Sequence, residues 1–368
     1  MKEKIFINLV LGSLVFLAIF FLSAEYYKHK KPKAILIGAA GKQGQEYFNL
    51  LKNDIEFMAF VVSPNTFQDI EKQSFLEAAM RGNIKIFVGI EELKQAISNN
   101  QINFEVAFIA IPHHLHEEFT TLLLRDNKII IKEKPLALNS QEVVTYEKIS
   151  KIKQPPIFTI VQRHFQASLI EAKKDLHLIG RPLSFSYEYC FNLPMMTPGW
   201  RANRLKSGGG VLIDMGYHII DVVNDFFGMP IISEINATFG FCYNEMFKAK
   251  LEDKAIISFN YPSGLKGEIK LSRHDFRKEE FIITGALGVM RINAINYVIY
   301  DLNGNVIKSY ESTQTKSQNK LDMLNIYLKN RHNEKYIDQE LKRHKNNVYI
   351  IDQIYKVAQL NHTILPIV

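Results

Sequence analysis

From residue 33 to residue 152, short apolar segments alternate with segments of helical periodicity. Five apolar segments are typical of buried strands, at residues 33–38, 55–62, 84–88, 106–111 and 128–132. Helices are predicted between and after them, at residues 42–51, 67–81, 90–98, 117–125 and 140–152. Continuous apolar strands are typical of a parallel sheet that is covered on both faces. This half of the chain therefore predicts an α/β fold with a doubly wound parallel sheet.

The second half of the chain has a different pattern. Gln-Pro-Pro at residues 154–156 breaks the alternation, and we place the domain boundary there, which gives domains of 33–154 and 155–368. Beyond it, alternating segments rich in aromatic residues predict a mostly antiparallel sheet with one covered face, at residues 158–161, 183–189, 233–241, 255–261, 265–271, 280–284 and 289–292. Residues 319–362 are predicted to be helical. A chain of 368 residues suits two domains better than one core.

The N-terminus carries an apolar run at residues 5–22, just long enough to span a membrane as a helix. More lysines follow the run (Lys28, Lys30, Lys31 and Lys33) than precede it, and the more basic flank tends to stay in the cytoplasm. We therefore expect residues 1–32 to be a transmembrane helix with a basic tether, in an inner-membrane protein whose catalytic body faces the cytoplasm. A cleaved signal peptide is the alternative interpretation.

Charge and cysteine content limit the partners. The net charge is +7, but the basic residues are dispersed, so we expect no nucleic-acid partner. The two cysteines, Cys190 and Cys242, stand in no metal or redox spacing and predict no disulfide framework.

A glycine-rich turn joins the first predicted strand to the first predicted helix. Gly38, Gly41 and Gly44 have the spacing G-x-x-G-x-x-G, with Lys42 and Gln43 between the last two. Such a turn lets a pyrophosphate approach the backbone at a helix N-terminus, so we predict that these five residues bind a dinucleotide.

The second predicted strand ends at Ser63, where an acidic residue would select NAD over NADP. Because the acid is absent and no arginine stands beside Ser63, the sequence leaves the choice between NAD and NADP open.

Two segments supply residues suited to hydride transfer. Lys134 lies between Glu133 and Pro135 at the end of a predicted strand, and Asp214 and His218 are four residues apart on one predicted helix face. Oxidation of a carbinol needs a base for the hydroxyl proton, for which we choose His218, and a cation beside the developing alkoxide, for which we choose Lys134. Asp214 is predicted to orient the substrate. No third metal ligand accompanies Asp214 and His218, and we expect no metal site.

Several motifs in this order resemble those of the Gfo/Idh/MocA oxidoreductases. They are residues 106–116, which end in Pro112, His113, His114 and His116, then Glu133-Lys134-Pro135, residues 162–165, residues 179–181, Trp200-Arg201 and residues 208–221. The resemblance implies an N-terminal Rossmann domain and a C-terminal α/β domain with an open sheet that binds substrate and forms oligomers. It also implies a cis peptide before Pro135, with Lys134, Asp214 and His218 at the catalytic positions.

The resemblance, together with the loop positions, extends the expected sites. Pro112, His113, His116, Glu133 and Lys134 are predicted to contact the coenzyme, and Arg163, Trp200 and Arg201 the substrate, with Asp214 and His218. The expected function is NAD(P)-dependent oxidation or reduction of a sugar, nucleotide sugar or cyclitol by a homo-oligomer. An NAD-dependent glycosidase of the same superfamily and a non-catalytic NAD(P)-binding regulator are the alternatives.

Overall fold

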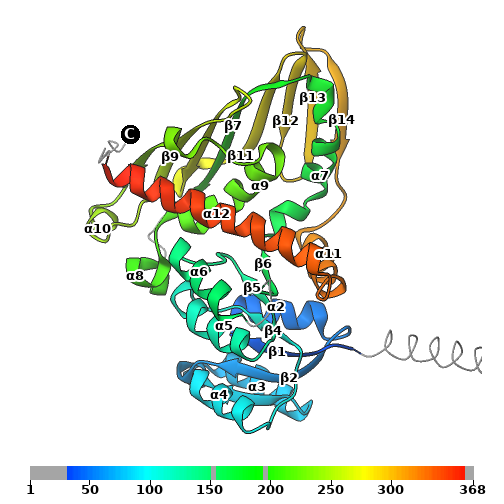
Figure 1. Cartoon of the computed structure of the whole chain (residues 1–368), viewed down its shortest axis with the longest axis vertical. Coiled ribbons are helices and arrows are strands. Elements are labelled where there is room, and N and C mark those ends of the chain that lie inside the picture. The colour runs from blue at the N-terminus through cyan, green and yellow to red at the C-terminus, as the bar shows by residue number, and fades with distance from the viewer. Residues whose placement is uncertain (1–30, 151–154, 194–197, 361–368) are drawn as a thin grey trace, which may run out of the picture.

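The computed structural model describes residues 31–150, 155–193 and 198–360, with side chains as far as Ala358. Two sheets form separate layers that lie one above the other (Figure 1). The first is a six-stranded parallel sheet of order β3-β2-β1-β4-β5-β6. Its strands are β1 (Lys33–Ile37), β2 (Glu56–Val62), β3 (Lys85–Val88), β4 (Val106–Ile109), β5 (Ile129–Glu133) and β6 (Ile157–Ile160).

Helices cover both faces of this sheet, as the continuous apolar strands predicted. Alternate residues of β1 enter different cores: Ile35 and Ile37 pack with α4, α5 and α6, whereas Ala34 and Leu36 pack with α2, α3 and α11. These helices are α2 (Lys42–Leu51), α3 (Ile70–Arg81), α4 (Gly89–Ser98), α5 (His116–Arg125), α6 (Ser140–Ile149) and α11 (Lys316–Lys329). The doubly wound parallel sheet is therefore confirmed.

One strand was assigned to the wrong sheet. Residues 158–161 were expected in the antiparallel sheet, but β6 pairs with β5 in parallel and completes the first sheet. A four-residue apolar strand has too few residues to show whether it is buried on one face or both. Helix α11 also belongs to this layer, since Tyr327 stacks on Phe158 and donates a hydrogen bond to Thr159 O at 3.0 Å.

The second sheet has eight strands in the order β14-β13-β12-β11-β7-β10-β9-β8. All pairs are antiparallel except β10 with β7, so the mostly antiparallel sheet is confirmed. The strands are β7 (Pro182–Asn192), β8 (Asn236–Gly240), β9 (Lys254–Asn260), β10 (Lys266–Ser272), β11 (His274–Gly285), β12 (Gly288–Ile292), β13 (Asn296–Asp301) and β14 (Val306–Glu311). The sequence analysis missed the edge hairpin β13–β14, whose last strand is largely exposed.

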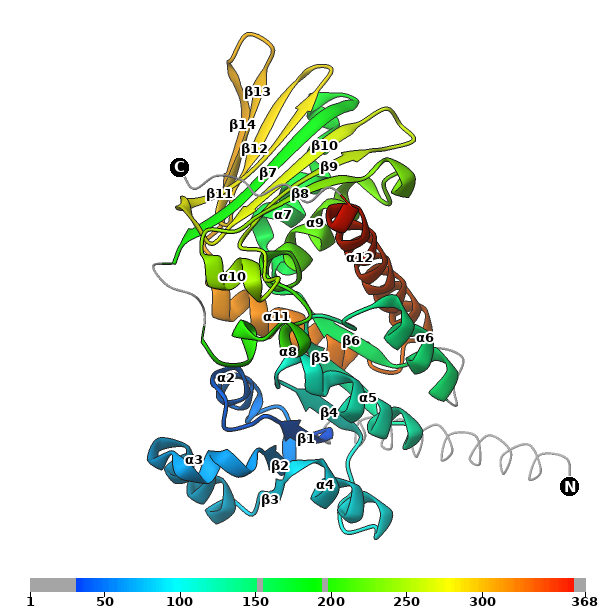
Figure 2. The ribbon, with the colours of Figure 1, turned by 90° about the vertical axis from the view of Figure 1, so that its left-hand side faces the viewer.

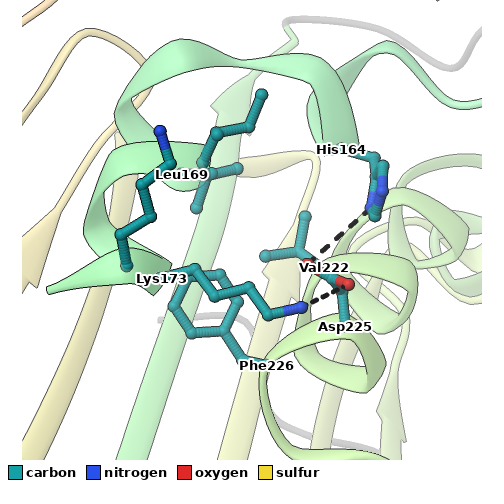
Figure 3. Close-up of a pocket in the computed structure, with 8 residues that line it drawn as sticks. His164, Leu169, Lys173, Val222, Asp225 and Phe226 are labelled. Atoms are coloured by element: carbon teal, nitrogen blue, oxygen red, sulfur yellow. Dashed lines mark hydrogen bonds and ion pairs between the residues drawn. The ribbon is translucent and has the colours of Figure 1, made fainter. Parts of the chain in front are cut away.

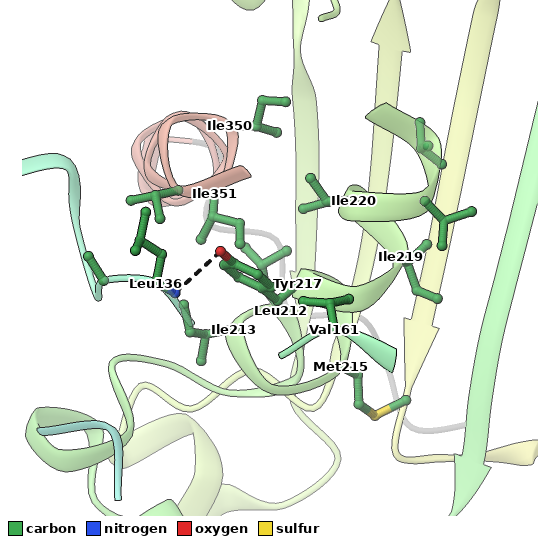
Figure 4. Packing of buried hydrophobic residues seen from close by; sticks show 14 of the residues in the cluster. Leu136, Val161, Leu212, Ile213, Met215, Tyr217, Ile219, Ile220, Ile350 and Ile351 are labelled. Carbon is green, nitrogen blue, oxygen red and sulfur yellow. Dashed lines mark hydrogen bonds between the residues drawn. The ribbon is translucent and has the colours of Figure 1, made fainter. Parts of the chain in front are cut away.

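Helices cover one face of the second sheet (Figures 1 and 2). They are α7 (Ala167–Lys174), α9 (Tyr217–Phe227) and α12 (Glu334–Leu360), and two short helices, α8 (Arg204–Ser207) and α10 (Asn244–Lys248), lie in the connections. Helix α12 contacts α9, β8, α6 and β6, so it bridges the two layers. Tyr217 lies at this junction, packed among apolar side chains of α9 and α12, and accepts a hydrogen bond from Leu136 N at 3.3 Å (Figure 4).

The expectation of a transmembrane helix is corrected. No helix in the described part of the chain is long and apolar enough to cross a membrane. The longest, α12, has 27 residues, but charged side chains recur along it. The apolar run at residues 5–22, on which the expectation rested, lies outside the described residues. The anchor and the inner-membrane location with a cytoplasmic body are therefore not carried further.

Candidate active site

Two cavities lie where the parallel strands end. One of about 420 Å³ extends over β2 and β4, and one of about 500 Å³ lies between the two layers. Gly41, Ala110, Ile111 and Pro112 line both. The strand order reverses between β1 and β4, and ligands of open α/β sheets bind at such a switch point, beyond the carboxyl ends of the strands. The smaller cavity is called the coenzyme groove below, and the larger one the central cavity.

The glycine loop forms the floor between them. Gly38 has a φ of +83°, and a Cβ on it would lie 2.2 Å from Ala110 O; a Cβ on Gly44 would lie 2.3 Å from Gly38 O. Larger residues at either position would force β1, β4 and α2 apart. Gly41 stands at the N-cap of α2 without a side chain that could occupy the free amides of the first helical turn. The loop is therefore an open anion cradle, and Lys42 and Gln43 line the central cavity beside it.

The end of β2 shapes the coenzyme groove. Ser63 lines it and lies 3.3 Å, Oγ to Oγ1, from Thr66, which also lines it. Lys72 from α3 lines the groove too, and its ammonium pairs with Asp69. The sequence analysis missed Lys72 because it follows Ser63 by nine residues and reaches the groove only after the chain turns back into α3.

The residues after β4 divide into two groups. Pro112 and His113 line the central cavity. His113 Nδ1 lies 2.8 Å from Ser207 O, and burial, with the charge of Lys134, lowers its pKa to about 3. His116 lines neither cavity: it is buried, and its Nε2 lies 3.0 Å from Ile111 O. His116 therefore does not reach the predicted coenzyme position. Its side chain contacts the loop after β4 from the protein interior instead.

Glu133 reaches the central cavity at the end of β5. Its carboxylate accepts a hydrogen bond from the Tyr47 hydroxyl, and burial raises its pKa. Lys320 of α11 lines the same cavity and donates to Gln43 Oε1 at 2.9 Å and Glu46 Oε2 at 2.8 Å. The C-terminal part of the chain thus supplies a cation next to the glycine loop.

Lys134 and Asp214 are brought together, as the sequence analysis predicted. Lys134 Nζ donates to Asp214 Oδ1 at 2.8 Å and to its backbone oxygen at 2.7 Å. Arg273 donates to Asp214 Oδ2 at 2.9 Å, and Arg201 Nε lies 3.8 Å from Oδ1. Burial alone would raise the pKa of Asp214, but the three cations outweigh burial and hold the pKa well below its usual range. The carboxylate therefore stays ionised.

Asp214 and His218 stand where a helix begins irregularly. Residues Leu212–Gly216 form one π-helical turn, and α9 follows at Tyr217. Such turns are frequent at functional sites, and Asp214 in this turn and His218 in the first turn of α9 both line the central cavity. Burial, with the Lys134 and Arg163 charges, holds the pKa of His218 well below its usual value, so the imidazole is neutral. Its Nδ1 is buried and has no hydrogen-bond partner among the described residues.

Of the three predicted substrate contacts between residues 163 and 201, two line the central cavity. Trp200 and Arg201 do so, with the guanidinium 4.3 Å from the indole centroid, and the indole is 4.6 Å from the His113 ring. Arg163 does not. It is buried in an ion pair with Glu279, and its guanidinium lies 4.1 Å from the Tyr189 ring centroid. Arg163 therefore supports Tyr189, which lines the cavity in its place.

Behind the cavity, a second lysine fixes the Glu133–Pro135 loop. Lys132 is fully buried, and its ammonium donates to Leu136 O at 2.8 Å and Thr120 Oγ1 at 3.2 Å. Burial lowers its pKa to about 7. The Lys134-Pro135 peptide is cis, as the resemblance implied.

Sequence reasoning missed four residues of the central cavity and its charge cluster: Gln162, Tyr189, Arg273 and Lys320. Gln162 directly follows residues 158–161, which the sequence analysis placed in the wrong sheet. Arg273 and Lys320 lie 59 and 277 residues from the partners they contact, Asp214 and Gln43, and carry no local motif.

A third cavity, of about 410 Å³, lies on the outer side of α7 and α9 (Figure 3). Lys173 pairs there with Asp225 at 2.6 Å, and His164 Nδ1 lies 3.9 Å from the same carboxylate. Apolar side chains of Leu169, Val222 and Phe226 form the rest of the wall that Figure 3 labels. It has neither a glycine loop nor strand ends, so it does not have the features of a dinucleotide site.

Comparison with known proteins agrees with this geometry. Residues 33–155 match the model of the oxidoreductase family with an NAD-binding Rossmann fold, and residues 174–291 match that of the GFO/IDH/MocA C-terminal domain. The chain belongs to the GFO/IDH/MocA family of oxidoreductases, and its first layer is an NAD(P)-binding domain.

Several of the similar proteins are dehydrogenases or reductases. The chain is 26% identical to the mouse (Mus musculus) trans-1,2-dihydrobenzene-1,2-diol dehydrogenase, over 60% of this chain and 63% of that protein. It is 27% identical to the levoglucosan dehydrogenase of Pseudarthrobacter phenanthrenivorans, over 57% and 56%. The matched part thus spans less than two thirds of these relatives. Among solved structures, a 3-ketoreductase from Actinomadura kijaniata in complex with NADP and TDP-benzene has the same fold, with a TM-score of 0.72, 12% identity and coverage of 89% and 98%.

Proposed function

We propose that the chain is an NAD(P)-dependent dehydrogenase or reductase that acts on a CH–OH or ketone carbon of a sugar, nucleotide sugar or cyclitol. One observation carries the proposal. Lys134 lies 80 residues before Asp214 and 84 before His218, yet all three line the same cavity as the glycine loop residues Gly41 and Lys42. A cation, a carboxylate and a neutral imidazole thus converge beside a cradle for a dinucleotide.

The coenzyme is assigned to the groove and the adjoining end of the central cavity. Gly38, Gly41 and Gly44 leave room for the pyrophosphate at the start of α2, and Ser63 and Thr66 flank the ribose position at the end of β2. Pro112 and His113 line the passage to the central cavity. When bound, the nicotinamide supplies the hydride acceptor or donor.

Lys134 and His218 are assigned to the substrate oxygen. An ammonium has three N–H groups, and two of those on Lys134 donate to Asp214, which leaves the third for the oxygen where charge develops. In oxidation, the neutral His218 imidazole accepts the hydroxyl proton as the carbon loses hydride and the C=O bond forms; in reduction it returns that proton.

Asp214 is assigned to positioning both the substrate and the cations. Its oxygens accept from Lys134 and Arg273, and a carboxylate has further lone pairs for a substrate hydroxyl. Trp200, which lines the central cavity, offers an apolar indole for a sugar ring, and Arg201 beside it offers donors for hydroxyl or phosphate oxygens. The similarity to levoglucosan dehydrogenase supports a carbohydrate-like substrate.

We also propose that the chain forms a homo-oligomer through the second sheet. Helices α7, α9 and α12 cover one face of this sheet, and the other face is open (Figure 1). Light scattering coupled to size-exclusion chromatography measures the mass in solution. A dimer or tetramer that becomes a monomer when Ser186, on the open face of β7, is replaced by arginine supports this interface; a monomeric wild type rejects it.

The test of the activity is a substrate panel followed by nicotinamide absorbance. Sugars, nucleotide sugars and cyclitols are offered with NAD and NADP, and their ketones with the reduced coenzymes. Turnover of one class, lost in Lys134→Ala and His218→Ala but kept in Lys173→Ala at the third cavity, supports the proposal. Coenzyme binding without turnover of any compound, with unchanged binding in the two site variants, would instead indicate a non-catalytic sensor.

A further inference from the structure

Three polar side chains meet at one end of the second sheet, outside the central cavity. They are Cys242, just after β8, Asp253, just before β9, and His274, the first residue of β11. Their ligand atoms, the cysteine Sγ, a carboxylate oxygen and an imidazole nitrogen, all lie within 4.8 Å of one another. Figure 2 shows β8 and β9 side by side in this sheet, with α10 at the end where the three residues meet.

The His274 ring is held in the form that binds metals. Its Nδ1 lies 2.8 Å from Leu193 O, and because a carbonyl can only accept, Nδ1 carries the proton. The other nitrogen, Nε2, then has a free lone pair in the neutral ring. This atom is buried and has no hydrogen-bond partner among the described residues, and only 10% of the side chain is exposed. Histidines that bind metals commonly donate their second N–H to a backbone carbonyl in this way.

Asp253 faces that nitrogen from a fully buried position. Its Oδ2 lies 3.7 Å from His274 Nε2, too far for a hydrogen bond. The carboxylate accepts two contacts from the Cys242 amide, at 2.9 and 3.0 Å, which orient it and leave lone pairs for another group. A tetrahedral ion with bonds of about 2.0–2.3 Å separates its ligands by roughly 3.3–3.8 Å, so the observed N–O distance fits such an ion.

We propose that Cys242, Asp253 and His274 form a Zn²⁺ site. A thiolate, an imidazole and a carboxylate are the three ligand types that zinc takes in proteins, and the pair of anionic ligands neutralises its charge. With three protein ligands, the fourth position is left to water. The proposal departs from the sequence expectation of no metal site, which rested on the absence of closely spaced ligands; here they come from three strand ends.

The site is connected to the candidate active site through Arg273. This residue precedes His274, and its backbone N donates to Asp253 O at 3.0 Å. Its guanidinium donates to Asp214 Oδ2 at 2.9 Å. An ion held by Asp253 and His274 therefore fixes both the residue that follows Arg273 in the chain and the residue whose carbonyl accepts from its backbone N, and it stabilises the orientation of the guanidinium toward Asp214. This role is structural and does not depend on the proposed hydride transfer.

Metal content and spectroscopy test the site on the full chain. Protein stripped with a chelator and dialysed against Zn²⁺ is expected to retain about one equivalent by mass spectrometry of the metal. Replacement by Co²⁺ is expected to give a thiolate-to-cobalt charge-transfer band in the near ultraviolet. Zn²⁺ is also expected to slow alkylation of Cys242 and to raise the unfolding temperature.

The variants Cys242→Ser and His274→Gln separate this site from other binding. Each is expected to weaken Zn²⁺ binding by more than the roughly 10–100-fold that loss of a supporting hydrogen bond causes, and Cys242→Ser to remove the cobalt band. Cys190→Ser, at the other cysteine, is the matched control and is expected to bind as the wild type does.

The wild-type readings alone decide the matter if a variant does not fold. Less than a tenth of an equivalent of zinc, a cobalt spectrum without the thiolate band, or equal binding by Cys242→Ser and wild type would each overturn the proposal.

Discussion

Two clusters of charged and polar side chains meet α9 at different points and serve as a comparison. The cavity cluster, at the turn before α9, consists of Lys134, Asp214, Arg201 and Arg273. The enclosed cluster, between α9 and α12, consists of Asp221, Arg343, His344 and Asn347: Arg343 donates to Asp221 Oδ2 at 3.0 Å and Asn347 to Oδ1 at 2.7 Å.

Both clusters shift pKa values, but only one is accessible. Burial raises the pKa of Asp221 to about 6, and the surrounding cations lower that of Asp214. Asp221 has no exposed surface, whereas Asp214 is one-quarter exposed to a cavity of about 500 Å³. A shifted pKa therefore does not by itself identify a site of chemistry; contact with a cavity that holds reactants does. Mutations in the cavity cluster are therefore expected to affect turnover, and mutations in the enclosed cluster are expected to affect stability.

The largest effect is expected at the base beside the cavity cluster. Because general acid–base catalysis contributes roughly 10²–10⁴-fold, His218→Ala is expected to lower kcat/KM by that factor. The pKa of His218 lies well below 6.5, so the imidazole is already deprotonated at neutral pH, and the acidic limb of the wild-type pH profile should lie below pH 6.5. Steady-state kinetics from pH 5 to 9 measure both. An acidic limb above pH 6.5 would contradict the assignment.

Lys134→Met is expected to have the next largest effect. Loss of a donor at a developing oxyanion reduces turnover by roughly 100–1000-fold. The free energy of unfolding should change little, since Arg273 and Arg201 still neutralise Asp214. Kinetics and denaturant unfolding are compared with Lys173→Met, whose lysine also pairs with an aspartate but lies at the third cavity. A variant that loses as much stability as activity would erase the distinction between the clusters.

Arg343→Met tests the enclosed cluster in the opposite sense. Removal of the cation leaves Asp221 buried without its ionic partner, which is expected to lower the free energy of unfolding by about 3 kcal/mol. The folded fraction should keep its kcat within a few-fold, because neither residue lines the central cavity. Urea unfolding and single-temperature kinetics check this. Full stability with lost turnover would reverse the roles assigned to the two clusters.

The effect of Lys132 on stability is the one that depends most on pH. Its pKa is about 7 in the folded chain and about 10.5 when unfolded, so between these values the unfolded state binds more protons. Its contribution to stability therefore rises with pH, by up to about 1.4 kcal/mol per unit between pH 7 and 10, and is constant below pH 7. The difference in unfolding free energy between wild type and Lys132→Met should follow this slope; a difference independent of pH would show that Lys132 is not buried as a neutral amine.

Features encoded within a few consecutive residues could be predicted from the sequence. The glycine loop, the Glu133–Pro135 segment and the Asp214–His218 pair each depend on one strand end or one helix start, and all occur where expected. The parallel sheet followed from its apolar strands because burial on both faces leaves a pattern that needs no long-range information.

Features that depend on residues far apart in the sequence could not be predicted. Arg163 and Arg273 look alike in the sequence, yet one pairs with Glu279 inside the second domain and the other with Asp214. The partner of each is decided by sheet register, since β11 pairs with β7 with a shift between His274 and Lys278. The Cys242, Asp253 and His274 cluster likewise exists only because three strands end at one place.

The packing of α11 on the first sheet means that the coenzyme half of this chain is not a separable piece. Met323, Leu324 and Tyr327 complete its hydrophobic core from a point more than 160 residues after β6. A ribosome releases the first six strands long before α11 exists, so that core stays open to water until α11 has also been made. Deletion of residues 319–368 should accordingly disable dinucleotide binding, although it removes none of the loop glycines.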